Sequence, residues 1–194
     1  RSAQSDIAQQ FLTKSKVDVL LGGGEDFWYP AGNPGAFPDE PAEDPSEKSK
    51  GTRGNLVDKA KQLGYTYVTN KTDLQKAKGN KLLGLFANEE MFQQREEGDG
   101  DIYNPVVTLP DMTKKAIDTL SKNKKGFFLM VEEEAIDEMA HENNAALTIK
   151  AGQQLDKAVQ VAKDFAKENP DTLVLVLADH ETGGLSIEPV DAED

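Results

Sequence analysis

The sequence predicts an α/β fold in which helices cover both faces of a largely parallel central sheet. Strand-like and helical patterns alternate along the whole chain, as they do in layered α/β domains. Two apolar runs, residues 127–131 and 173–178, lack the alternation of a half-exposed strand. We therefore expect them to be the central strands, buried on both faces. Acidic residues and histidines follow each run directly.

Shorter elements are expected on either side of these runs. The apolar stripe of residues 145–168 predicts a long amphipathic core helix that ends at Asn169 and Pro170. The other expected helices are 6–12, 55–63, 72–78 and 109–121, and the other expected strands are 17–21, 65–69 and 81–86. Residues 31–54, rich in Pro, Gly and charge, predict a long irregular or mobile surface loop with little apolar surface to bury.

Length, charge and composition narrow the class of protein. The 194 residues fit part of a single domain, and no cysteine is present, so any metal must be bound by oxygen and imidazole. A net charge of −13 argues against a nucleic-acid partner and repels phosphate unless cations bridge it, although solubility is the simplest explanation. No run of about 18 apolar residues predicts a transmembrane helix, and no signal-peptide pattern begins at Arg1.

The first candidate site follows residues 127–131. Glu132 stands at the expected carboxyl end of that strand, where open α/β sheets place ligands. Asp137 and His141 come next, four residues apart, so a helix places both on one face. A carboxylate and an imidazole together are half of a zinc site, and an ordinary surface histidine is an equally good interpretation of His141.

The second candidate site follows residues 173–178. Asp179 and His180 end this run, and the turn at Gly183 and Gly184 allows neighbouring side chains to converge. The chain has only two histidines, and each lies beside a carboxylate just after an expected strand. We therefore expect both acid–histidine pairs to cluster at one edge of the sheet.

These motifs resemble those of alkaline phosphatases, the bacterial secreted type above all. The resemblance is carried by Phe-Phe-Leu-Met-Val-Glu at 127–132, Ile-Asp-x-x-x-His at 136–141, and Ala-Asp-His-Glu-Thr-Gly-Gly-Leu at 178–185. Counterparts of residues 18–24, 51–56 and 84–86 precede them in the same order. The similarity thus extends over nearly the whole chain.

The resemblance implies a phosphomonoester hydrolase with two zinc ions, one magnesium ion and a phosphoserine intermediate. Asp137 and His141 match ligands of the first zinc, Asp179 and His180 match ligands of the second, and Glu132 matches a magnesium ligand. It also implies small phosphomonoester substrates and a secreted, periplasmic or extracellular location. A homodimer is the candidate assembly of the complete protein, with no membrane or nucleic-acid partner.

Several of the family's functional residues have no counterpart here. The nucleophilic serine, the phosphate-clamping arginine and further metal ligands match positions before Arg1, and the last histidine of the first zinc site matches a position after Asp194. We therefore expect an internal fragment that is inactive by itself. Glu133 and Glu134 stand where the family usually has glycine and a small residue. They could crowd a magnesium site or attract a cation, and the sequence does not decide between these.

Two other functions stay open at this point. The chain could be a non-catalytic fragment that keeps the fold and some metal affinity. A related metal-dependent sulfatase or phosphomutase is more distant, since the residues after His180, Glu-Thr-Gly-Gly, favour a phosphatase.

Overall fold

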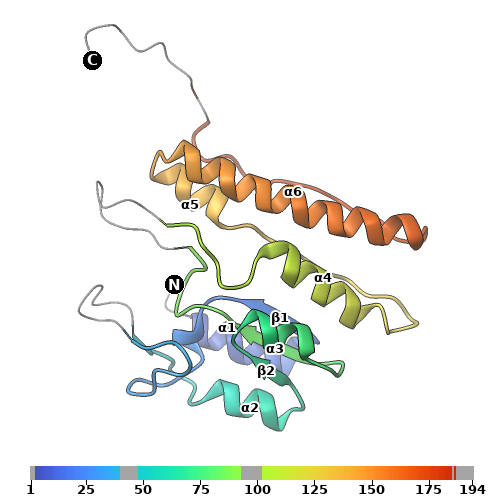
Figure 1. Cartoon of the computed structure of the whole chain (residues 1–194). Helices are drawn as coiled ribbons and strands as arrows, with labels where there is room; N and C mark the ends of the chain where they lie inside the picture. Colours follow the sequence, from blue (N-terminus) through green and yellow to red (C-terminus); the bar gives the residue numbers. More distant parts are fainter. Residues whose placement is uncertain (1–2, 40–47, 93–101, 185, 187–194) are drawn as a thin grey trace, which may run out of the picture.

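The computed structural model of the chain describes residues 3–39, 48–92, 102–184 and 186, and centres on a three-stranded parallel sheet. The strand order is β1 (Val19–Gly22), β3 (Leu82–Leu85) and β2 (Thr66–Val68). Leu82 of β3 lies in register with Val19 on one side and Thr66 on the other. Figure 1 shows this sheet in the lower half of the molecule, with the longer helices above it.

Helices cover both faces of the sheet. Side chains alternate along β3, so successive residues pack against helices on opposite faces. Leu83 and Leu85 pack in one cluster with α1 (Gln4–Gln10) and α2 (Leu56–Gln62). Leu82 packs in a second cluster with α3 (Lys71–Lys76) and α4 (Leu109–Leu120). Gly84 leaves room on this second side, where a Cβ atom would come within 2.4 Å of the Phe86 ring and 2.8 Å of Leu21. The predicted helix–sheet–helix layering is therefore present.

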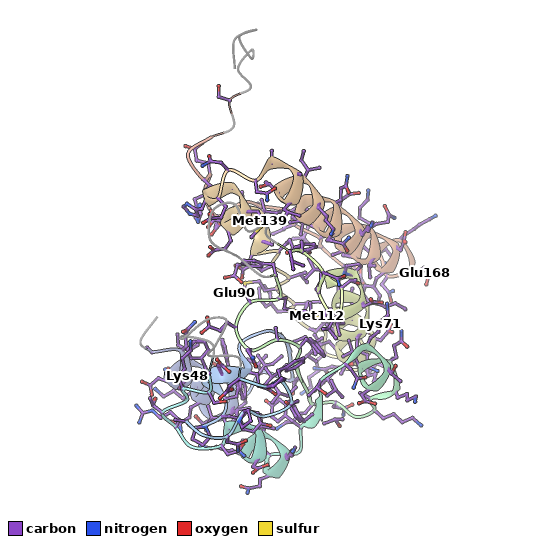
Figure 2. The ribbon with its side chains drawn as sticks, turned by 60° about the vertical axis from the view of Figure 1, so that its left-hand side comes forward. Lys48, Lys71, Glu90, Met112, Met139 and Glu168 are labelled. Carbon is purple, nitrogen blue, oxygen red and sulfur yellow. The ribbon has the colours of Figure 1, made fainter. Side chains whose placement is uncertain are left out.

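The longest helix, α6 (Ala145–Glu168), lies over α4 and α5 (Ala135–His141) (Figure 1). Met139 of α5 is fully buried in a third cluster, together with Ala151 of α6 (Figure 2). Four helices begin at a residue whose side chain accepts a hydrogen bond from the backbone N–H three residues on, which are Asn55, Asn70, Thr108 and Asn144. These caps explain why the helix starts lie close to their predicted positions.

Two short turns precede the predicted irregular loop. After α1 the chain forms a π-helical turn, Phe11–Ser15, and after β1 a short 3₁₀ turn, Glu25–Phe27. The loop at about 31–54 has neither helix nor strand in its described parts, 31–39 and 48–54, apart from a bridge between Pro30 and Gly51.

This loop is anchored by polar contacts. The carboxyl group of the fully buried Glu25 accepts hydrogen bonds from the backbone N–H groups of Ala36 and Phe37 and from the Tyr67 hydroxyl. Ser49, only 2% exposed, donates to the Asn33 carbonyl oxygen at 2.6 Å. The composition of the loop indicates only that it has little apolar surface to bury. In the structure, these hydrogen bonds attach it to the rest of the protein instead.

The prediction that residues 127–131 and 173–178 are buried central strands is wrong for this structure. Both runs are extended but are not paired with any strand of the described sheet. Phe128 is 89% exposed, Leu173 79% and Leu177 81%. An apolar run is buried on both faces only when neighbouring strands and covering layers are there to receive it. The described sheet ends at β1 and β2, so these runs have no neighbouring strands and no covering layers there.

No helix within residues 3–39, 48–92, 102–184 and 186 is long and apolar enough to cross a membrane.

Candidate metal centre

The first acid–histidine pair lies on the short helix α5. Ala135 and Met139 are the buried residues of this helix, so the opposite face, with Asp137 and His141, is turned toward solvent. The pair is one turn apart, and His141 Nε2 lies 3.4 Å from Asp137 Oδ2. The expected i,i+4 geometry is therefore present.

The second pair lies in the turn after residues 173–178. The backbone N–H of His180 donates to Asp179 Oδ1 at 3.0 Å, and His180 Nε2 lies 3.3 Å from Asp179 Oδ2. Gly183 and Gly184 follow with φ values of +76° and +85°, a left-handed conformation that other residues rarely adopt. This turn brings the chain back toward α5.

The two pairs meet at Asp137. His180 Nδ1 lies 4.0 Å from Asp137 Oδ1, and the Thr182 hydroxyl donates a hydrogen bond to the same oxygen. Residues of α5 and of the turn, among them His141 and Thr182, line a shallow hollow of about 360 Å³. Sequence reasoning missed Thr182, although it stands in the Glu-Thr-Gly-Gly stretch directly after His180.

The position of this cluster differs from the predicted one. It forms at α5, away from the three-stranded sheet (Figure 1), and not at an edge of that sheet. The physical reason is the same as for the two apolar runs. Because residues 127–131 and 173–178 do not pair as strands, the residues that follow them are positioned by α5 and by the turn at Gly183 and Gly184.

The donor types fit zinc, but their number does not complete a site. Carboxylate oxygen and imidazole nitrogen are ordinary zinc ligands, and a zinc site has at least three protein ligands. Within the part of the chain that the structure describes, no three histidine or acidic side chains are arranged to share one metal ion. Glu132 is exposed in the extended segment before α5 and is not brought into the cluster. The described residues by themselves therefore form an incomplete metal site.

Glu133, the residue after Glu132, is half-buried, and its carboxyl group forms a hydrogen bond within the protein. The Tyr103 hydroxyl donates to its Oε2 at 2.6 Å. Burial raises the pKa of Glu133, against the hydrogen bonds from Tyr103 and Ala135, which lower it. This role differs from both alternatives that the sequence left open for this residue.

The geometry predicts a titration of His180 that can be measured. The Glu181 carbonyl oxygen, 2.8 Å from His180 Nδ1, raises the pKa of His180 above 6.5, and the Asp179 and Asp137 carboxylates add to this. The raised pKa means that the fold favours charged His180. Its contribution to stability is therefore present below the ordinary pKa and is lost as the pH rises through the raised one.

NMR titration of the two histidine rings in the presence of a chelator checks this expectation. The pKa of His180 should lie above 6.5 and should fall in an Asp179→Asn variant. A value at or below 6.5 in the unchanged chain would contradict the described contacts.

Fold and site together define a class: an α/β protein whose acid–histidine pairs could contribute ligands to metal ions. The chain belongs to the alkaline phosphatase family, because the family model described as alkaline phosphatase matches residues 1–193.

Curated relatives agree with this assignment. Alkaline phosphatase 4 of Bacillus subtilis is 38% identical over 95% of this chain and 34% of its own length. The alkaline phosphatase of Escherichia coli is 33% identical over 93% of this chain and 40% of its own. The chain thus spans about a third to two fifths of the length of the curated relatives it matches.

Solved structures show the same fold. The alkaline phosphatase of Thermus thermophilus superimposes with a TM-score of 0.69 at 27% identity, covering 88% of this chain and 32% of its own. The cold-active enzyme of a Shewanella species gives 0.62 at 29% identity, over 86% and 34%. A variant of the enzyme from the bacterium TAB5, described with Mg bound, gives 0.59 at 26% identity, over 87% and 41%.

Proposed function

We propose that this chain forms about a third of a secreted or periplasmic alkaline phosphatase, an enzyme that hydrolyses small phosphomonoesters. In the complete protein, Asp137 and His141 would bind one zinc ion, Asp179 and His180 a second, and Glu132 a magnesium ion. The observation that carries the proposal is the position of Asp137, within 4.0 Å of both imidazoles. The relatives and their share of matched length support it.

The metal ions would supply positive charge for the phosphoryl group and for the entering and leaving oxygens. This chain's own residues would place that charge. Asp137 lies between the two histidines, and Thr182 fixes one of its carboxylate oxygens by donating a hydrogen bond. The serine that would form the phosphoserine, the further ligands and a homodimer contact belong to the proposal for the complete protein.

The test uses the complete protein with a chromogenic phosphomonoester. Asp137→Ala and Asp179→Ala are each expected to lower kcat/KM at least about 100-fold. Loss of a ligand would release or displace a metal ion whose positive charge stabilises the transition state. Their zinc content per protein should fall as well. Lys157→Ala, on an exposed face of α6, is the control and should retain full activity. Unchanged activity and metal content in both aspartate variants would reject the proposed roles.

A further inference from the structure

Glu133 is joined to a buried tyrosine at the start of α5. Tyr103 is 5% exposed and packs in the same cluster as Ala135 and Met139 of that helix. Its hydroxyl donates to Glu133 Oε2 at 2.6 Å, and the backbone N–H of Ala135, the first residue of α5, donates to the same carboxyl group. Glu133 therefore connects the first turn of α5 to the protein interior.

Tyr103 is held from the other side by α6. Lys150 Nζ donates to the Tyr103 backbone oxygen at 2.6 Å and lies 5.6 Å from the centroid of the tyrosine ring. Lys150 belongs to α6, which packs along α5. The orientation of the Tyr103 hydroxyl, and hence of Glu133, is thus set by contacts with two other parts of the chain.

We propose that Glu133 is a positioning residue, which fixes the first turn of α5 through Tyr103 and Ala135 and so holds Asp137 against His180 and Thr182. The backbone N–H of Asp137 donates to the Glu134 carbonyl oxygen at 3.0 Å, so Asp137 lies in that first turn. Partners that orient metal ligands from behind typically account for about 10- to 100-fold in metal affinity. Only the expected effect on metal binding rests on the proposed function. The contact of Asp137 with His180 is present in the chain without any metal.

NMR spectroscopy of the metal-free chain tests it, since the sequence has only two histidines and their ring signals are easily assigned. Contacts between the His180 ring protons and the Asp137 β protons are expected to disappear in Glu133→Ala. They should weaken in Tyr103→Phe, which removes only the hydroxyl and keeps the ring packed. Glu133→Gln keeps an oxygen acceptor for both donors and is expected to restore them. Glu168→Ala is the control, because it removes the same charge at the exposed end of α6.

Titration of the same variants with zinc alone gives a second readout. Affinity is expected to fall about 10-fold in Glu133→Ala and to be unchanged in Glu168→Ala. Contacts that persist in both Glu133→Ala and Tyr103→Phe, or that are absent from the unchanged chain, would overturn the proposal. Since these contacts are measured without metal or substrate, their loss or survival is independent of whether the complete protein is a phosphatase.

Discussion

The isolated 194-residue chain is expected to hydrolyse a chromogenic phosphomonoester no faster than buffer does, even with saturating zinc and magnesium. Its rate should lie at least about 10³-fold below that of the complete protein, because loss of a nucleophile alone costs several orders of magnitude. We expect none of its serines to act as the nucleophile, because the resemblance to alkaline phosphatases matches none of them to that residue. Ser5 and Ser49 are buried, and their hydroxyls donate to the backbone oxygens of Phe27 and Asn33.

The electrostatics of the chain point the same way. No three ligands in the described residues are arranged around one point, so zinc should bind weakly. Without bound metal, a net charge of −13 repels a phosphomonoester dianion. The measurement is steady-state hydrolysis by the purified chain, with His180→Ala as a contamination control. Robust turnover that disappears in this variant would show that the missing catalytic set is present or replaced.

How far the fold can be predicted from sequence depends on where each element finds its stabilisation. The bounds of helix α6 agree with the prediction, because its apolar period and the Asn169-Pro170 stop are local signals. The Asn144 cap found in the structure is a local feature as well. Residues 127–131 and 173–178 carry an equally clear apolar signal, yet their burial depends on strands and layers elsewhere. The local sequence determines the apolar run, but it does not determine which strands and helices cover that run.

The candidate site shows the same division. The Asp137–His141 contact follows from helical spacing and was predictable. The hydrogen bonds of Thr182 to Asp137 and of Tyr103 to Glu133 join residues far apart in sequence. No local pattern marks such partners, because a threonine or tyrosine in a loop has many equally good roles.

A second large effect is expected far from this site, at Glu25. Replacing it by alanine should lower the free energy of unfolding by about 3–5 kcal/mol, a large part of the stability of a typical domain. Glu25 is fully buried, and the N–H groups of Ala36 and Phe37 and the hydroxyl of Tyr67 all donate to its carboxyl group. Burial, and then the hydrogen bond to Glu25, raises the pKa of Tyr67, so the hydroxyl stays a donor across the physiological range. In the alanine variant three donors would lose their acceptor in a region that water reaches poorly.

Urea unfolding followed by tryptophan fluorescence measures this effect where it arises. Trp28 is the chain's single tryptophan, is 6% exposed, and donates its backbone N–H to the Glu25 carbonyl oxygen. Tyr67→Phe removes only one of the three donors and should cost about 1 kcal/mol. Glu168→Ala, at the exposed end of α6 (Figure 2), removes the same charge and should change stability by no more than about 0.5 kcal/mol. If Glu25→Ala were no more destabilising than Glu168→Ala, the loop at 31–54 would not be held by Glu25, and its attachment would have to come from the Ser49 contacts instead.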